Sequence, residues 1–390
     1  MKILSVSPLP PHRGGSAVSC GLLLSGFAAA GHALRVLSPL VADSPDGDAF
    51  AVAHPDIEVT RFPVPFEELS PNLPAGDAYR DNESRQIRAL LPELIRRQRP
   101  DLVFIGRETF AYDALEIARA HAIPSVLRIA GAMAIGMLHR TLPEIAVRHL
   151  VEQFRHADLL ICPAEHLAAR LRPFQLPPIQ VIRNAVDTAR FSPAAKAPAL
   201  LQRWNLTERD IVVAHASNLK TLKRPLDLVE SATSALRRDS RLRYLVIGHG
   251  PTRQQMEDEC HARSIADSFR FTGWIGHEQM PDYLNLADLV VMPAEDETQA
   301  RVYLETQACG RVLLASDIAA AREVVVDNDN GVLFRKGDVA DLVAKTLQLA
   351  SDPERRARIG RSARARVAVH ALPAVVRDYL TALAGVGATA

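Results

Sequence analysis

The chain has 390 residues, which is too long for one ordinary hydrophobic core and predicts two domains. Its 46 Lys and Arg residues balance 45 Asp and Glu residues, so the basic excess typical of a nucleic-acid-binding protein is absent. The N-terminal residues lack the apolar core of a secretory signal, and no apolar run approaches the roughly 18 residues of a membrane span. The four cysteines lack metal-site spacing, which predicts reduced, buried thiols in a cytosolic protein.

Short apolar runs alternate with amphipathic stretches along the chain. In the first half we predict strands at 2–8, 33–39, 101–106, 125–130, 158–163 and 179–184, and helices at 17–31, 83–98 and 114–122. In the second half we predict strands at 211–217, 243–250, 270–274, 288–293, 311–316 and 331–334, and helices at 226–239, 253–264, 278–287, 339–352 and within 354–385. Continuous Val, Ile and Leu runs are typical of buried parallel strands, and this alternation predicts two doubly wound parallel sheets.

The domain boundary is predicted near residues 184–200, which are rich in Pro and Ala and contain no strand pattern. It separates an N-terminal domain, 1–185, from a C-terminal domain, 186–365, and leaves 366–390 as a terminal helix. Ligands of such sheets bind at the carboxyl ends of the strands, so the loops that follow strands are the candidate sites.

The first of these loops is 7–21, in which Gly14 and Gly15 precede a helix. Paired glycines allow a ligand to approach the backbone closely, and a helix N-terminus favours an anion. The alternative is a tight turn in which Ser16 caps the helix. The loop is not GxGxxG, which argues against a nicotinamide-dependent oxidoreductase.

The second loop, within 215–230, carries Lys220, Lys223 and Arg224 after a strand and just before a helix that begins at Pro225. Three cations at the end of a parallel strand attract phosphate, and the dipole of the following helix adds to this attraction. The alternative is a solvated basic loop.

The third loop lies within 295–310 and carries Glu297 and Glu305. Glu297 is predicted just before a helix that begins near 300–302, and Glu305 within it, so that helix N-terminal amides lie between two carboxylates. Carboxylates accept hydrogen bonds from sugar hydroxyls, and the amides can hold a diphosphate, which together match a sugar nucleotide. The alternative is that Asp296 or Glu297 caps the helix while Glu305 is solvated.

Two other stretches are ambiguous. Asp46-Gly47-Asp48 has the form of a metal-binding DxD, but it lies in a loop rich in Pro, Asp and Gly and is interpreted as a turn. Residues 139–160 combine arginines and histidines with Leu, Ile and Val, which predicts a domain helix before the next strand; the alternative is a membrane-facing surface.

Six segments, in order, resemble the retaining glycosyltransferases of the GT-B fold, specifically the large family-four group. They are VIRNAVDTARFSP (181–193), HASNLKTLKRP (215–225), IGHGP (247–251), FTGWIGHEQMPDYL (271–284), ADLVVMPAEDE (287–297), and the pair Glu297-x7-Glu305 followed by ACG. Within the second segment, Ser217–Arg224 is most similar to the glucosaminyl-malate synthases of bacillithiol biosynthesis.

The resemblance implies two Rossmann-like domains with a cleft between them, and a final helix that crosses back to the N-terminal domain. It implies transfer of a hexose or N-acetylhexosamine from a nucleoside diphosphate sugar, with UDP favoured over GDP, to a glycan, lipid-linked or small-molecule acceptor. Retention would proceed by front-face attack, without an enzymic nucleophile, a cofactor or a metal.

The family's roles are carried over by position. Glu297 would bind the donor sugar and Glu305 the ribose, while Ile275 would contact the base. The residues for the diphosphate would be Gly15, Lys220, Lys223, Arg301 and Val302. Glu297 and Lys223 would be the catalytic residues.

The sequence departs from the family pattern at several positions. Asn218 replaces an arginine of the phosphate loop, and Arg301 is expected to compensate for it. Ala130 stands where a strand usually ends in a histidine near the transferred sugar, and Arg128 and His139 are the candidate substitutes.

The alternative functions are a sugar-nucleotide-binding protein and a GT-B epimerase, each without transferase activity. The expected partners are a nucleotide-sugar donor and an acceptor that the sequence does not identify; nucleic acid is not expected. The sequence does not indicate the oligomeric state. The expected location is cytoplasmic, with peripheral contact to the inner face of the membrane as the alternative.

Overall fold

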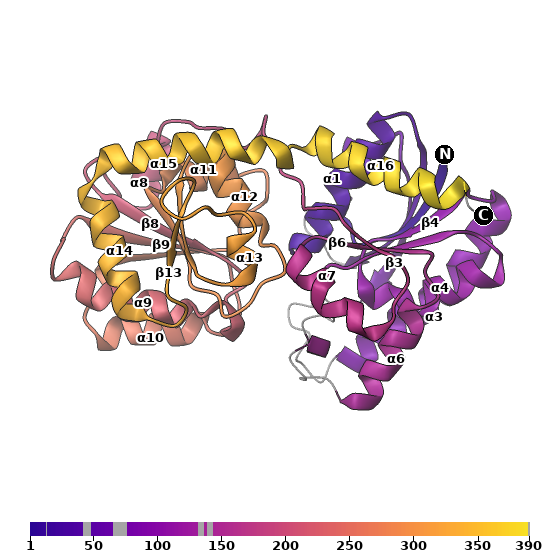
Figure 1. Ribbon diagram of the computed structural model, residues 1–390. Helices are drawn as coiled ribbons and strands as arrows, with labels where there is room; N and C mark the ends of the chain where they lie inside the picture. Colours follow the sequence, from indigo (N-terminus) through magenta and orange to yellow (C-terminus); the bar gives the residue numbers. More distant parts are fainter. Residues whose placement is uncertain (13, 42–47, 65–75, 132–135, 139–142, 389–390) are drawn as a thin grey trace. The chain divides into compact units, whose positions relative to one another are not determined.

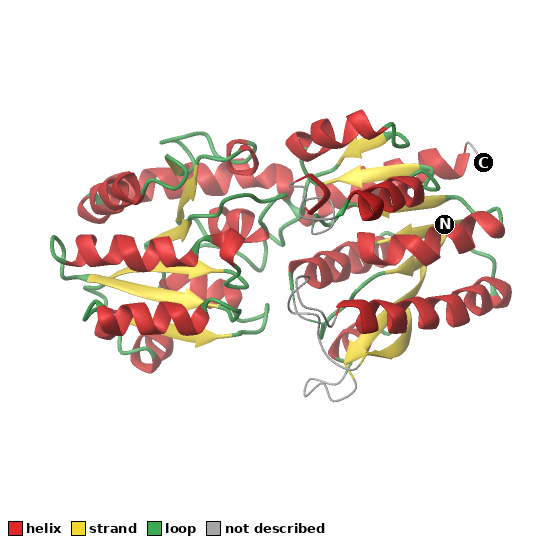
Figure 2. Ribbon diagram, turned by 90° about the horizontal axis from the view of Figure 1, so that it is seen from below, coloured by secondary structure: helices red, strands yellow, loops and turns green. Residues whose placement is uncertain are grey.

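The computed structural model describes residues 1–12, 14–41, 48–64, 76–131, 136–138 and 143–388 (Figure 1). The chain divides into two compact units: Met1–Ala185 with Leu372–Ala390, called unit 1, and Val186–Ala371, called unit 2. Each unit contains one parallel sheet with helices on both of its faces (Figure 2). The predicted class, two doubly wound parallel-sheet domains, is confirmed. No helix among the described residues is both long and apolar enough to span a bilayer.

Unit 1 contains a seven-stranded sheet in the order β3-β2-β1-β4-β5-β6-β7. Its strands are β1 (Lys2–Val6), β2 (Ala33–Val41), β3 (Glu58–Val64), β4 (Leu102–Ile105), β5 (Ser125–Arg128), β6 (Leu159–Cys162) and β7 (Ile179–Val181). Its helices are α1 (Gly15–Ala29), α2 (Ala49–Ala53), α3 (Gly76–Arg97), α4 (Ala111–Ala120), α6 (Glu144–Phe154), α7 (Glu165–Leu171) and α16 (Leu372–Ala388), with the 3-10 turns η1 (Glu108–Phe110) and η2 (Arg172–Phe174).

Inner strands of unit 1 such as β4 and β6 are apolar runs because both faces of the sheet are covered. On β1, Leu4 and Val6 belong to the core that α3, α4, α6 and α7 share. Ile3, the residue before Leu4, belongs to the opposite core with α1 and α16. Successive side chains of a strand point to opposite faces, so two covered faces require an uninterrupted apolar run.

Two of the differences from the sequence-based expectation concern an edge strand and the start of helix α1. Strand β3 was not predicted, because it includes the half-buried Arg61 and the exposed Pro63; it is an edge strand, where proline is tolerated. Helix α1 begins at Gly15, and its N-cap is Gly14 with φ 110°. The alternative in which Ser16 caps the helix is therefore wrong: the cap position is Gly14, whose positive φ favours glycine.

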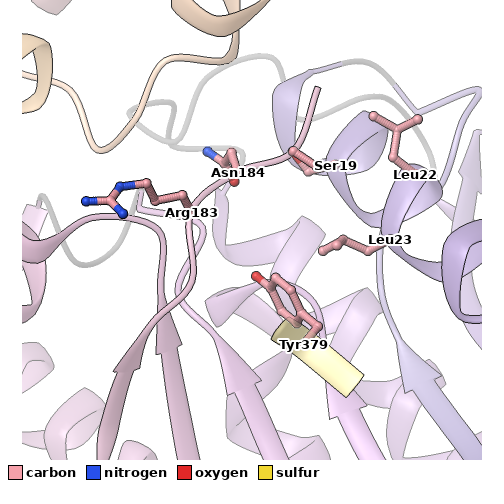
Figure 3. A pocket seen from close by; sticks show the side chains of 7 residues that line it. Ser19, Leu22, Leu23, Arg183, Asn184 and Tyr379 are labelled. Atoms are coloured by element: carbon pink, nitrogen blue, oxygen red, sulfur yellow. The ribbon is translucent and has the colours of Figure 1, made fainter. Parts of the chain in front are cut away.

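The final helix, α16, belongs to the core of unit 1. It packs against α1 so closely that a Cβ on Gly26 would lie 2.4 Å from Val376 Cγ2. Tyr379 of α16 lies near Leu23 of α1 and the segment at Asn184, where a narrow pocket is formed (Figure 3). The C-terminal residues therefore complete a face of the N-terminal sheet.

Unit 2 contains a six-stranded sheet in the order β10-β9-β8-β11-β12-β13. Its strands are β8 (Ile211–Ala216), β9 (Leu242–Ile247), β10 (Phe269–Gly273), β11 (Leu289–Met292), β12 (Val312–Ser316) and β13 (Val332–Phe334). Its helices are α8 (Pro198–Arg203), α9 (Pro225–Leu236), α10 (Arg253–Ala262), α11 (Met280–Leu286), α12 (Arg301–Ala308), α13 (Ala319–Arg322), α14 (Val339–Ser351) and α15 (Pro353–Arg366), with the 3-10 turns η3 (Thr221–Lys223), η4 (Ala266–Ser268) and η5 (Val367–His370).

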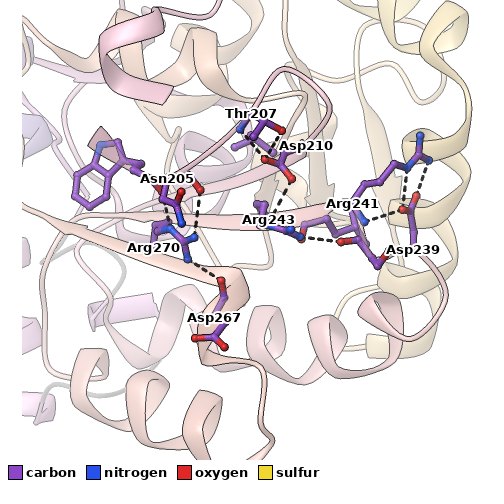
Figure 4. Close-up of polar contacts among 12 residues, drawn as sticks. Asn205, Thr207, Asp210, Asp239, Arg241, Arg243, Asp267 and Arg270 are labelled. Carbon is purple, nitrogen blue, oxygen red and sulfur yellow. Dashed lines mark hydrogen bonds and ion pairs between the residues drawn. The ribbon is translucent and has the colours of Figure 1, made fainter. Parts of the chain in front are cut away.

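Arginines stabilise the loops that enter β8, β9 and β10 at their amino ends (Figure 4). Arg270 donates to the carbonyl oxygens of Trp204 at 2.6 Å and Asp267 at 2.8 Å. Arg243 donates to Ser240 O at 2.8 Å and lies 3.5 Å from an Asp210 carboxylate oxygen. These contacts satisfy backbone carbonyls of the same unit, so this end of the sheet is structural.

Candidate functional site

The candidate site of unit 2 lies at the point where the strand order reverses. β8 and β11 are neighbours, with Leu289 opposite Val213, while β9 and β10 extend the sheet on one side and β12 and β13 on the other. The loops that follow β8 and β11 therefore emerge side by side. Ligands of open parallel sheets bind at this switch point, beyond the carboxyl ends of the strands.

The loop after β8 is shaped by a buried hydrogen-bond chain. His215 Nδ1 lies 2.9 Å from Val291 O, and its Nε2 lies 2.8 Å from Ser217 Oγ. A carbonyl only accepts, so Nδ1 carries the proton and Nε2 accepts from Ser217, whose Oγ in turn accepts from Leu219 N at 3.0 Å. Burial lowers the pKa of His215 to about 4, which keeps the ring neutral at pH 7.

The same loop packs directly on the glycine turn after β9. A Cβ on Gly248 would lie 1.9 Å from Ser217 O, and one on Gly250 would lie 1.8 Å from Asn218 O. Thr252 donates its hydroxyl to Leu219 O at 2.6 Å. The IGHGP segment therefore needs its glycines for backbone contact with the basic loop.

Lys223 and Glu297 form an ion pair across the switch point. Only 18% of the Lys223 side chain and 8% of the Glu297 side chain are exposed. The backbone also joins the two loops, because Glu295 N donates to Leu222 O at 2.8 Å. The structure thus brings together the two residues for which the sequence predicts catalytic roles.

The other cations of this loop lie in different surroundings. Lys220 is half-buried at the start of η3. Arg224 donates to Asp227 at 2.8 Å and to Glu295 at 3.3 Å, and Glu295 also pairs with Lys336 at 2.7 Å. Arg224 therefore holds the loop and the start of α9, whereas Lys223 faces Glu297.

The N-terminus of α12 follows the loop after β11. Its N-cap is Ala300, and within the described chain no side chain caps it. Asp296 accepts from Glu297 N at 2.8 Å and Glu297 pairs with Lys223, so the alternative that either carboxylate caps the helix is wrong. Uncapped first-turn amides and the helix dipole favour an anion here.

Glu305 lies in the second turn of α12 and is 4% exposed, so the alternative that it is solvated is also wrong. Its Oε1 lies 2.7 Å from Arg301 Nη2 and 2.9 Å from His277 Nε2. Burial alone would raise the pKa of Glu305, but the charges of Arg301 and His277 outweigh it and lower the pKa to about 2. Glu305 is therefore a carboxylate at every physiological pH.

His277 is the residue that the sequence analysis missed. It lies in the FTGWIGHEQMPDYL segment, two residues after Ile275, but nothing in its spacing relates it to Glu305. Ile275 itself is partly buried against the core of unit 2. Both residues follow β10, so the loop after a third strand reaches the site.

The candidate residues of unit 1 lie at the ends of its own strands. Gly15 is exposed at the start of α1. Arg128 is buried and donates to Asn184 Oδ1 at 2.8 Å and Gly106 O at 3.3 Å. His139, the other candidate substitute at this strand end, lies outside the described residues.

The DxD-like segment and the 139–160 stretch are described in part. Asp48 caps α2 through Ala51 N and pairs with Arg61, while Asp46 and Gly47 lie outside the described residues. No three His, Cys, Asp or Glu residues in the described ranges are grouped to hold a metal ion. Helix α6 contributes Val151 and Phe154 to the core of unit 1, which agrees with a domain helix.

Comparison with protein families gives a match for each half of the chain. Residues 197–366 match the family described as glycosyl transferases group 1, and residues 13–190 match glycosyltransferase family 4. Similar curated proteins include an α-D-kanosaminyltransferase of Streptomyces kanamyceticus, 31% identical over 49% of this chain and 50% of the relative. Another is a D-inositol 3-phosphate glycosyltransferase of Salinispora tropica, 31% identical over 52% of this chain and 45% of the relative. The chain thus spans about half the length of these relatives.

Solved structures share the fold over the whole chain. HepE of Anabaena in complex with UDP and glucose has a TM-score of 0.79 at 17% identity, covering 99% of this chain and all of that one. Sucrose-phosphate synthase from Thermosynechococcus elongatus has a TM-score of 0.84 at 17% identity, with both chains fully covered. At this level of identity the likeness establishes the GT-B fold.

Proposed function

Because its two halves belong to two glycosyltransferase families, we propose that this chain transfers a hexose or N-acetylhexosamine from a nucleoside diphosphate sugar. UDP is the favoured nucleotide, since structural neighbours are complexes with UDP and UDP-glucose. The acceptor is a glycan, a lipid-linked glycan or a small molecule. The bacillithiol-type basic loop stays a resemblance within this proposal.

The observation that carries the proposal is the Lys223–Glu297 ion pair at the switch point of unit 2. A cation, a carboxylate and the uncapped amides of α12 occupy adjacent loops. A sugar diphosphate needs these three groups: positive charge for the phosphates, amide donors for their remaining oxygens, and a carboxylate for the sugar hydroxyls.

The proposed chemistry begins with an exchange of partners. Lys223 turns from Glu297 to the diphosphate, joined by Lys220 and by the main-chain N–H groups of Arg301 and Val302. The carboxylate of Glu297 then accepts from hydroxyls of the donor sugar. As the bond from the anomeric carbon to the phosphate breaks, the lysines and amides stabilise the negative charge that develops on the leaving group.

Other residues bind the rest of the donor. Glu305 accepts from a ribose hydroxyl, and Ile275 contacts the base. Retention follows if the acceptor attacks from the face that the diphosphate leaves and the leaving phosphate takes the acceptor's proton. This route assigns no nucleophile to the chain.

Thermal-shift measurements with UDP-sugars and GDP-sugars test the donor, since a ligand that binds only the native state raises the melting temperature. Release of nucleoside diphosphate from the stabilising donor then tests catalysis, and NMR of the product's anomeric proton tests retention. A melting shift without any release supports the alternative of a sugar-nucleotide-binding protein. Conversion of the donor to an epimeric sugar supports an epimerase.

A further inference from the structure

Two basic side chains converge on one oxygen of Glu305. Arg301 Nη2 lies 2.7 Å and Arg301 Nε 3.3 Å from Oε1, and His277 Nε2 lies 2.9 Å from the same atom. In the described part of the chain, every hydrogen bond to this carboxylate goes to Oε1. One oxygen is thus committed to the protein, which leaves Oε2 for a ligand.

The groups that hold Oε1 are themselves fixed. The Arg301 side chain is 9% exposed and lies one helical turn before Glu305 on α12. The ring of His277 packs on the fully buried ring of Phe191, with centroids 5.2 Å apart. Phe191 O in turn accepts from Arg364 at 2.8 Å. The geometry around Glu305 is therefore set by three separate segments of unit 2.

The contacts of His277 indicate the kind of ligand. Its Nε2 lies 2.9 Å from both Arg301 Nη2 and Glu305 Oε1. A guanidinium only donates and a carboxylate only accepts, so Nε2 can satisfy one of them at a time. A ligand hydroxyl both donates and accepts, so it can supply the hydrogen bond that Nε2 leaves unmade, whether the group left over is the guanidinium donor or the carboxylate acceptor.

We propose that Arg301 and His277 are positioning residues that fix Glu305 and present its Oε2 to one ribose hydroxyl of the donor. On this assignment the Arg301 guanidinium serves the ribose carboxylate, and only the main-chain N–H of Arg301 serves the diphosphate. The inference rests on the proposed function, because it requires a nucleotide donor.

Calorimetric titration with UDP, 2′-deoxy-UDP and 3′-deoxy-UDP tests the proposal. Wild type should lose affinity for one of the two deoxy compounds. Arg301→Leu should weaken UDP binding on the order of tenfold, as expected for a hydrogen bond to a charged group. It should barely change binding of the deoxy compound that lacks the contacted hydroxyl. Equal weakening for all three ligands would assign the guanidinium to the diphosphate and overturn the proposal.

Two further variants sharpen this test. His277→Phe keeps an aromatic ring on Phe191 and should show the same selective loss of UDP affinity; unchanged selectivity overturns the role of His277. Arg322→Leu removes an exposed arginine that pairs with Asp317 and should leave all three affinities unchanged.

Two measurements distinguish a failure of this proposal from a failure of the proposed function: nucleotide binding by wild type, and melting temperatures of ligand-free variants. If wild type binds neither UDP nor GDP, the proposed donor is wrong, and with it the ribose assignment. The contact itself is tested by melting temperatures of Arg301→Leu, Glu305→Gln and the double variant. Non-additive shifts support the positioning contact, whereas additive shifts overturn it.

Discussion

Lys223 and Glu297, 74 residues apart in sequence, form a largely buried ion pair that joins the loops after β8 and β11. Without a ligand the two charges neutralise each other. On the proposed function, a diphosphate that takes the lysine releases the carboxylate for the donor sugar, so that donor binding and exposure of this acid become one event. This exchange is the central feature of the proposed site.

The two glutamates should fail in different ways when substituted. Glu305→Ala removes the proposed ribose contact and should raise the KM for the donor about tenfold or more, while kcat changes little. Glu297→Gln keeps the shape of the side chain but removes its charge beside the reacting carbon, so kcat should fall about 100-fold with a smaller change in KM. Steady-state kinetics of nucleotide release measure both. Indistinguishable kinetics in the two variants would contradict the separate roles.

The ion pair should also appear in the stability of the ligand-free chain. Lys223→Met leaves a buried carboxylate without this partner and should lower the free energy of unfolding by about 1–3 kcal/mol. In a chain that already carries Glu297→Gln, Lys223→Met should lower the free energy of unfolding by clearly less than it does in wild type. Urea denaturation of both single variants and the double variant measures this coupling.

A matched control uses another buried lysine pair of unit 2. Lys196 pairs with Asp288 at 2.7 Å, and its side chain is 11% exposed. Lys196→Met should combine additively with Glu297→Gln, because it belongs to a different pair. If the effects of Lys223→Met and Glu297→Gln were also additive, the Lys223–Glu297 contact would not be formed in solution.

His215 should make stability depend on pH in a defined window. Its pKa is lowered by burial from 6.5 to about 4, so the unfolded chain takes up the proton first. The stability that it contributes is complete above pH 6.5 and is lost as pH falls to about 4, by roughly 3 kcal/mol. His215→Asn should remove this loss of stability. The difference in free energy of unfolding between wild type and the variant should therefore become smaller as the pH falls.

Urea midpoints at pH 7 and pH 5 measure that effect. His249→Asn, at an exposed histidine two residues after β9, is the control and should keep the wild-type slope. An unchanged slope in His215→Asn as well would contradict a buried neutral ring beneath the basic loop.

Gly250 should tolerate no side chain. Its Cβ would lie 1.8 Å from Asn218 O, so Gly250→Ala must displace the basic loop and should weaken donor binding at least tenfold. Gly385→Ala on α16 is the control: nothing lies within 4 Å of its Cβ, and it should raise stability by about 0.5–1 kcal/mol. Calorimetric titration with the donor measures the affinity of each variant. An affinity equal to that of wild type in Gly250→Ala would contradict the contact between Gly250 and the basic loop.

Much of the fold could be predicted because both sheets are covered on two faces. Buried strands such as β8 and β11 are then continuous apolar runs that stand out in the sequence. Strand β3 was not predicted because an edge strand needs no such run, and because residues such as its Arg61 and Pro63 are typical of a loop. Burial on both faces is thus what makes a strand visible in the sequence.

The candidate site was predictable only in part. Position after a strand and family spacing identified Lys223, Glu297 and Glu305, but not their partners. The contact of His277 with Glu305 joins residues 28 apart, and it depends on how the loop after β10 folds over α12. The sequence offered Arg301 as a phosphate-binding cation, but it did not indicate that the Arg301 guanidinium also pairs with Glu305, one helical turn further along α12.

The most direct measurement is a crystal structure with the nucleoside diphosphate that stabilises the chain most in the thermal-shift panel. The diphosphate should lie between Lys223 Nζ and the main-chain N–H groups of Arg301 and Val302, and the ribose should lie on Glu305. Lys223 should no longer pair with Glu297. A nucleotide bound elsewhere, with the Lys223–Glu297 pair intact, would contradict the proposed site.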